Sequence, residues 1–174
     1  MPSFTKISAI LLRLIELTFI TIILALSGAL IEQQFRGGTP TRVNFSIFAA
    51  VFATLSLLLY LIPASIFSKI DNPIASTVLD GLNCVFLLSA GIAMAAQLGG
   101  RSCGNKEFLL NNGITNGGGY FSPAKRCHEA NAMTAFHWFA FAAFLGSFAI
   151  SAYGIRGMTT RSGNGGSRKP MSQV

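Results

Sequence analysis

The sequence predicts an all-α protein, a bundle of four transmembrane helices, and two observations favour that fold class. The 174 residues are 51% hydrophobic and only 11% charged, against about 25% charged residues in soluble domains. The apolar residues gather in four segments, each long enough to cross a hydrocarbon layer of about 30 Å. This composition argues against a soluble enzyme, a disordered chain and a coiled coil.

The four segments cover residues 7–31, 43–67, 74–98 and 133–155. Inside a bilayer each backbone N–H and C=O must be paired within its own segment, so we expect helices. The alternation of period two that is typical of membrane barrels is absent from the sequence. The first segment ends in Glu32-Gln33-Gln34 without a small-x-small cleavage pattern, so we interpret it as a retained helix and not as a signal peptide.

The connections differ in length and composition. Residues 32–42 and 68–73 form short polar connections, and Asp71-Asn72-Pro73 is typical of a turn before a helix start. Residues 99–132 are rich in Gly and Asn, which predicts a large irregular loop between the third and fourth helices. We therefore divide the chain into a four-helix domain at 1–156 and a flexible basic tail at 157–174.

The net charge of +7 indicates contact with anionic lipid head groups, not with nucleic acid, because the basic residues flank the apolar segments. The residues predicted to make these contacts are Lys6, Arg13, Arg156, Arg161, Arg168 and Lys169. An even number of helices places both termini on one side. Seven basic residues on that side against six on the other only weakly favour a cytosolic location for the termini.

Cys103 and Cys127 lie 24 positions apart in the large loop, whereas Cys84 lies within the third apolar segment. Two cysteines that bracket one flexible loop favour a disulfide, which needs an oxidising compartment. The loop would then lie outside the cytosol and both termini inside. The alternative is two free thiols in a cytosolic loop.

Arg13 and Glu16 lie three residues apart in the first segment and therefore share one helical face. The favoured interpretation is an interfacial ion pair in which the Arg13 side chain extends toward the head groups. The alternative is a lipid-phosphate site formed by Arg13 and Lys6.

Asp80 and Asn83 are polar residues inside the third segment, again on one helical face. Because a carboxylate inside a membrane is costly, one hypothesis is a proton- or cation-handling site. The favoured hypothesis is a hydrogen-bonding patch that packs helices together, with Asn44 or His137 as partner. No second buried acid or intramembrane lysine is evident to complete a relay.

The sequence lacks the common signatures of hydrolase, nucleotide-binding and metalloprotease sites, so we expect no enzymatic activity. His128, His137 and Cys84 lie at scattered depths, and we expect no metal site and no cofactor. Small residues on three of the segments favour close helix packing within one chain, with a homo-oligomer as the alternative.

Several stretches together resemble the fungal non-classical export protein 2 family. They are TRVNFSIFAA at 41–50, LDGLN at 79–83 with Val85-Phe86, Arg101-Ser102-Cys103-x-Asn105 with Arg126-Cys127, and the terminal Ser172-Gln173-Val174. This resemblance implies a four-helix protein of MARVEL type.

The resemblance further implies a plasma-membrane organiser of furrow-like domains and eisosomes that responds to sphingolipids and influences export of proteins without signal sequences. The implied partners are membrane lipids (sphingolipid or sterol), eisosome coat proteins and other plasma-membrane proteins. The alternative function is a small transporter, channel or accessory subunit with Asp80 in an aqueous path.

Overall fold

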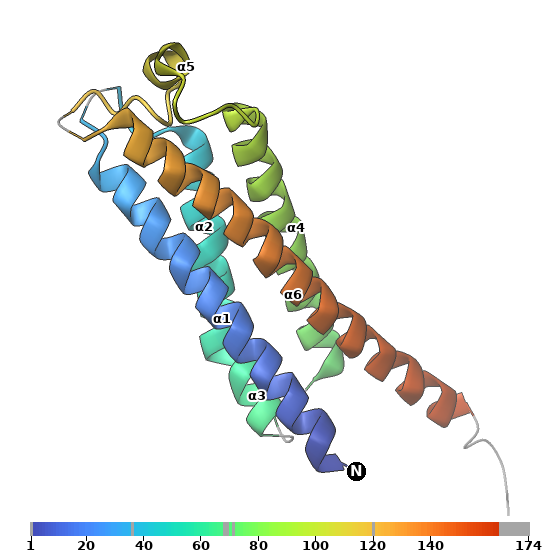
Figure 1. Ribbon diagram of the computed structural model, residues 1–174. Helices are drawn as coiled ribbons and strands as arrows, with labels where there is room; N and C mark the ends of the chain where they lie inside the picture. Colours follow the sequence, from blue (N-terminus) through green and yellow to red (C-terminus); the bar gives the residue numbers. More distant parts are fainter. Residues whose placement is uncertain (1, 36, 68–69, 71, 120, 164–174) are drawn as a thin grey trace, which may run out of the picture.

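The computed structural model describes the backbone of residues 2–35, 37–67, 70, 72–119 and 121–163, and the side chains of these from residue 7 to residue 153. Four long helical rods run side by side (Figure 1). They are α1 (Pro2–Glu32), a continuous rod of α2 (Thr41–Ser56), η1 (Leu57–Leu61) and α3 (Ile62–Ile66), then α4 (Pro73–Leu98) and α6 (Pro123–Gly163). All four contain a segment long and apolar enough to cross a membrane. The predicted fold class, a four-helix transmembrane bundle, is confirmed.

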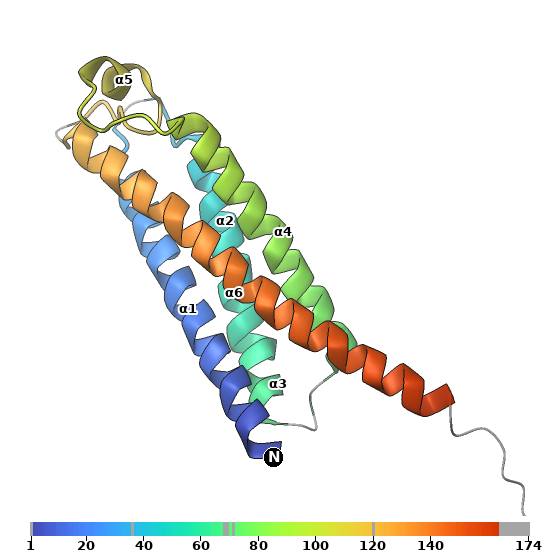
Figure 2. The same cartoon turned by 45° about the vertical axis from the view of Figure 1, so that its right-hand side comes forward.

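The helices alternate in direction, so the bundle has two distinct ends (Figures 1 and 2). We call the end that carries the connections 33–40 and 99–122 the loop end. The opposite end, where α1 begins, α4 begins and α6 finishes, is the terminal end. Helix α6 packs against α4 and α1, and α2 packs against both of these as well. The termini of the described chain therefore lie at the same end of the bundle.

The third connection is more ordered than the sequence predicted. It contains a short helix, α5 (Lys106–Asn111), whose first turn is capped because the Asn105 side chain accepts a hydrogen bond from the Phe108 N–H at 3.2 Å. Helix α6 begins at Pro123, ten residues before the predicted segment 133–155. The polar residues at its start are held by tertiary contacts that hydropathy does not register.

Helix α6 also continues to Gly163, so the first residues of the predicted flexible tail at 157–174 are helical. An established helix gains one hydrogen bond per added residue, and isolated glycines do not end it without a capping contact. Residues 164–174 lie outside the described residues.

The rod formed by α2, η1 and α3 contains a π-helical turn immediately before Pro63. Proline has no N–H to donate, which disturbs the regular hydrogen-bond pattern of the preceding turn. Beside this turn, the Tyr60 hydroxyl accepts a hydrogen bond from the Asn72 N–H at 3.1 Å. The rod therefore continues past Pro63 to Ile66 by way of a π-helical turn.

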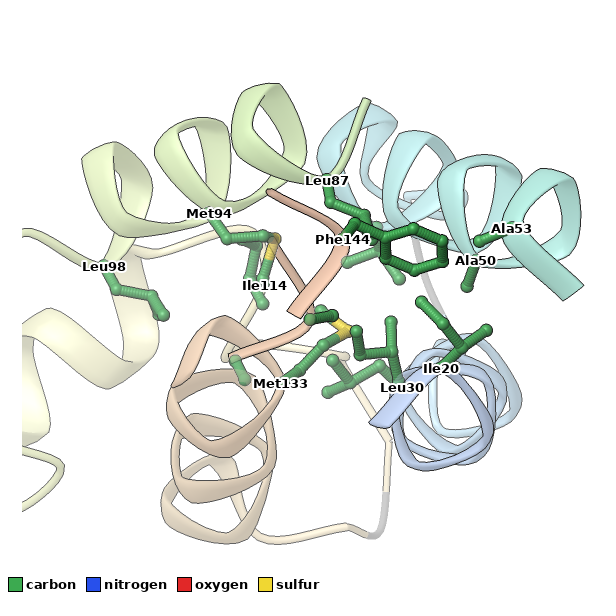
Figure 3. Packing of buried hydrophobic residues seen from close by; sticks show 14 of the residues in the cluster. Ile20, Leu30, Ala50, Ala53, Leu87, Met94, Leu98, Ile114, Met133 and Phe144 are labelled. Atoms are coloured by element: carbon green, nitrogen blue, oxygen red, sulfur yellow. The ribbon is translucent and has the colours of Figure 1, made fainter. Parts of the chain in front are cut away.

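The core is packed from all four rods (Figure 3). Small residues of α2, including Ala50 and Ala53, let larger side chains such as Ile20 and Phe144 approach. At the start of α4, the Asn72 side chain caps the first turn by accepting from the Ile74 N–H at 3.1 Å. Close packing of this kind fixes which polar side chains of neighbouring helices meet inside the bundle.

Candidate functional site

A cluster of charged and hydroxyl side chains lies inside the bundle toward the terminal end. Arg13 Nη1 donates to Asp80 Oδ1 at 2.6 Å and Arg13 Nη2 donates to Asp80 Oδ2 at 2.8 Å. Arg13 Nη1 also donates to Glu16 Oε2 at 3.0 Å. Two serines complete the polar cluster: the Ser147 hydroxyl donates to Glu16 Oε1, and the Ser151 hydroxyl donates to Asp80 Oδ2 at 3.3 Å.

Three helices supply these side chains, each by a simple helical spacing. Arg13 and Glu16 are three residues apart on α1, and Ser147 and Ser151 are four residues apart on α6. Asp80 lies seven residues after the start of α4, about 10 Å along the helix axis. We name Arg13, Glu16, Asp80, Ser147 and Ser151 the ion-pair cluster. It links α1, α4 and α6 directly.

The ion-pair cluster corrects two parts of the sequence interpretation. Arg13 is only 7% exposed, and its guanidinium is directed to Asp80 and Glu16, not to the head groups as predicted. Glu16 is fully buried, so a second buried acid does exist beside Asp80. The physical reason is tertiary: the bundle brings a cation on α1 next to an anion on α4, and pairing relieves the cost of burying either one.

The partner of Asp80 is Arg13, and not Asn44 or His137 as the sequence suggested. Asn44 is exposed at the loop end of α2, and the His137 Nδ1 lies 2.8 Å from the Met133 carbonyl oxygen. Asn83 does bridge two helices, because its Nδ2 donates to the Ser56 Oγ at 2.8 Å. A packing role thus describes Asn83 well, whereas Asp80 belongs to an ion pair that the sequence did not indicate.

The geometry of the ion-pair cluster limits what it can do chemically. Asp80 is fully buried, and both of its carboxylate oxygens accept hydrogen bonds from Arg13. A bidentate pair of this kind orients both groups and holds the helices that carry them. The arrangement is suited to fixing how the helices pack. When all three charged side chains are ionised, the cluster holds two negative charges and one positive charge.

A second buried arginine, Arg126, lies at the loop end; the sequence indicated it only as the neighbour of Cys127 and predicted no site role for it. Its Nε donates to the Ile114 carbonyl at 3.0 Å and its Nη1 donates to the Leu30 carbonyl at 3.0 Å. Its Nη2 donates to the Gln34 Oε1 at 2.6 Å. Arg126 is fully buried and thereby joins the end of α1, the third connection and the start of α6. We name these contacts the arginine clamp.

A disulfide lies beside the arginine clamp. Cys103 and Cys127 are bonded, with their Cα atoms 5.7 Å apart, as the sequence predicted. Cys84 is a buried free cysteine. Since Cys127 follows Arg126 directly, the bond fixes the third connection to the same turn of α6 that carries the clamp.

Two further arginines lie at the loop end and were absent from the predicted head-group set. Arg42 donates to the Gln97 Oε1, and the Arg101 guanidinium lies 5.6 Å from the centre of the Phe108 ring. Both are exposed, and neither has a carboxylate partner among the described residues. Arg101 and Gln97 line a cavity of about 360 Å³ at the end of α4.

Most of the predicted head-group contacts fall on residues whose side chains are not described. The side chains of Lys6, Arg156 and Arg161 lie outside the described residues, and so do Arg168 and Lys169 as a whole. Their contacts with lipid stay predictions.

Comparison with protein families gives one match over most of the chain. Residues 6–150 match the MARVEL family model, described as a membrane-associating domain. No solved structure matches significantly.

Three curated fungal proteins are similar over most of their length. The non-classical export protein 2 homolog of Schizosaccharomyces pombe is 33% identical over 141 residues, which cover 81% of this chain and 74% of the relative. Non-classical export protein 2 of Saccharomyces cerevisiae is 32% identical over 145 residues, which cover 83% of this chain and 80% of the relative. Non-classical export protein 102 of Candida albicans is 32% identical over 149 residues, which cover 86% of this chain and 84% of the relative.

Proposed function

Because the chain belongs to the MARVEL membrane-associating family, among relatives named non-classical export protein 2, we propose that it organises lipids and proteins within a fungal plasma membrane. In this function it acts without catalysis. It helps to form furrow-like domains and eisosomes, responds to sphingolipids and influences unconventional protein export. The observation that carries the proposal is the distribution of polarity in the bundle.

The charged side chains buried in the spans, Arg13, Glu16 and Asp80, are paired with one another inside the bundle, while large apolar side chains face outward. Every rod contributes exposed apolar side chains. They include Leu11 on α1, Phe48 and Leu59 on the rod from α2 to α3, Val85 on α4 and Phe139 on α6. Such a surface interacts with lipid chains by packing and area, and differences in packing bias which lipids and proteins gather around it. A bound sphingolipid or sterol is the ligand class that this mechanism requires.

Two clusters of aromatic rings contribute to this surface. Phe48 and Phe52 of α2 contact Phe86 of α4, with ring centres 5.5 and 5.1 Å apart. On the opposite pair of helices, Phe19 of α1 lies 6.0 Å from Phe136 and 5.9 Å from Phe139 of α6. Rigid rings at helix boundaries provide surfaces against which a flat sterol or an ordered acyl chain packs closely.

We propose that the loop end faces the cell exterior and the terminal end faces the cytosol. The support is the Cys103–Cys127 disulfide, since disulfides persist in oxidising compartments. In intact cells, an impermeant maleimide should label the partly exposed Cys103 after mild reduction, while buried Cys84 within α4 serves as the internal unlabelled control. Labelling that requires membrane permeabilisation would reverse the orientation.

In this orientation, basic residues meet head groups at both surfaces. Arg42 and Arg101 are placed at the loop end for the exterior leaflet. The tail residues Arg161, Arg168 and Lys169 would meet the anionic cytosolic leaflet or the eisosome coat, at about 1 kcal/mol per basic residue.

The proposal is tested by imaging the tagged full-length protein before and after sphingolipid synthesis is blocked. We expect stable plasma-membrane patches that disperse on depletion. A uniform distribution that ignores the block would reject the organiser function for this chain.

A truncation series separates the contribution of the tail. Truncation after Gly163 removes only residues beyond α6, whereas truncation after Ile155 also shortens the helix. If basic tail residues hold the coat, an Arg168→Gln/Lys169→Gln variant, which keeps all helices at full length, should still form patches but should lose coat recruitment. Unchanged recruitment in all three variants would remove the tail from the mechanism.

A further inference from the structure

The ion-pair cluster holds one cation and two acids. If all three were ionised, Arg13, Glu16 and Asp80 would leave a net charge of −1 inside the bundle. Glu16 and Asp80 are fully buried, and Arg13 is nearly so. An uncompensated charge in an apolar interior is strongly unfavourable, so the cluster must either gain a proton or bind another cation.

The elements around the cluster offer no second cation among the described side chains. Helix α4 adds Cys84, one turn after Asp80, and α6 adds only the hydroxyls of Ser147 and Ser151. The rod from α2 to α3 carries no acid or base beyond Arg42 at the far end and Tyr60, which bonds to the connection at 70–72. Four further charged residues near the terminal end, Lys6, Lys69, Asp71 and Arg156, have side chains outside the described residues.

The two acids are not equivalent. Asp80 accepts from both guanidinium nitrogens of Arg13, at 2.6 and 2.8 Å, the arrangement that best stabilises an ionised carboxylate. Glu16 shares one of those nitrogens at 3.0 Å, and its other oxygen contacts the Ser147 hydroxyl. A hydroxyl can donate one hydrogen bond and can also accept, so it can bond to a protonated carboxyl as well as to an ionised one.

We propose that Glu16 is a proton-binding site, neutral in the packed bundle, which donates its proton to the Ser147 oxygen and so joins α1 to α6. The Ser147 hydroxyl then donates to a backbone carbonyl of its own helix, as serines inside helices do. When the proton leaves to water, a net negative charge remains in the cluster. The contact between α1 and α6 at this level is then weakened, and the bundle becomes sensitive to pH through one residue.

The first test measures thermal unfolding of the full-length protein in lipid nanodiscs from about pH 5 to about pH 9, a range in which an exposed glutamate is already ionised. The wild-type Tm should fall by about 5 °C across this range. Glu16→Gln, whose amide imitates the protonated acid, should keep the acidic-side Tm throughout. The matched control Glu107→Gln, at an exposed residue of α5, should follow the wild-type curve. A Glu16→Gln variant with the wild-type pH dependence would overturn the proposal.

The second test observes the proton directly by infrared spectroscopy. The chain has only six Asp and Glu residues, so a protonated-carboxyl band near neutral pH can be assigned by substitution. We expect this band in the wild type and in Glu107→Gln, and its loss in Glu16→Gln. A band that is lost in Asp80→Asn but kept in Glu16→Gln would place the proton on Asp80 and contradict the assignment. Absence of the band, with a Tm that rises with added sodium chloride, would instead indicate a bound cation.

Discussion

The bundle contains two buried arginines, one toward each end, that are satisfied in different ways. Arg13 toward the terminal end pairs with two carboxylates, whereas Arg126 at the loop end donates to two backbone carbonyls and one amide oxygen. The Leu30 carbonyl lies in the last turn of α1, where the helix dipole is negative. Charge neutralises the first arginine, and backbone dipoles solvate the second.

This difference has a consequence for stability. Removal of one member of a buried charge pair leaves the other charge uncompensated, which costs more than the loss of ordinary hydrogen bonds. Removal of Arg126 leaves neutral acceptors that water at the loop end can reach after a local rearrangement. The ion-pair cluster should therefore be the more sensitive of the two sites, and the loop end the more tolerant.

The largest effect is expected for Asp80→Leu. This variant leaves the Arg13 guanidinium with Glu16 as its only carboxylate partner among the described residues and should lower the free energy of unfolding by about 4 kcal/mol. Chemical unfolding in detergent micelles measures the loss. The double variant Arg13→Met/Asp80→Leu, which removes both charges, should recover much of it. If the double variant is as unstable as the sum of the two single changes, the two side chains are not coupled.

The next effect is expected at the disulfide. Replacement of Cys103 and Cys127 by serine frees a loop closed over 24 residues and should cost about 3 kcal/mol. The melting temperature with and without reductant measures it, since reductant should destabilise the wild type to the level of the variant. Cys84→Ser serves as control and should stay sensitive to reductant. A wild type that is indifferent to reductant would contradict a stabilising bond.

A smaller loss, about 2 kcal/mol, is expected for Arg126→Lys. Lysine keeps the charge but has one nitrogen, which cannot serve the acceptors on α1, on Gln34 just after α1 and on the third connection together. Hydrogen exchange should show faster exchange at 112–118 while the centres of α1 and α4 stay protected. Uniformly faster exchange along all four rods would show that the clamp supports the whole bundle and not the loop end alone.

The smallest effect, about 1 kcal/mol, is expected for Gly117→Ala. A Cβ at this position would lie 2.6 Å from the Gln33 carbonyl oxygen and 3.0 Å from the Arg126 guanidinium, so the clamp must shift. Gly113→Ala is the matched control, because a Cβ there meets nothing within 4 Å. Equal melting temperatures for the two variants would show that the clamp yields without cost.

The sequence predicts the four spans well because each has a strong local signal of length and hydropathy. It also predicts the Cys103–Cys127 pairing, since both cysteines bracket one loop. It does not predict that Arg13 meets Asp80, 67 positions away, because only the packing of α1 against α4 and α6 brings them together. The signal available in the sequence was that one apolar segment holds a cation, Arg13, and another holds an anion, Asp80.

The loop end shows the opposite limit. Arg126 stands in a stretch that hydropathy assigns to a loop, and its burial depends on carbonyls whose positions no sequence pattern encodes. The early start of α6 at Pro123 has the same cause, because its first turns are held by the clamp and the disulfide and not by apolar periodicity.

The length of α6 sets where the rest of the chain is presented. Its 41 residues span about 60 Å, more than the 40–45 Å of a bilayer with its head groups. Ser151 of α6 lies level with Asp80, from which α4 extends seven residues to its start and α6 extends twelve to its end. Helix α6 therefore projects about 8 Å farther than α4, as a rigid spacer. A protein that binds beyond Gly163 would be held clear of the neighbouring helix ends, with room to form a layer along the membrane surface.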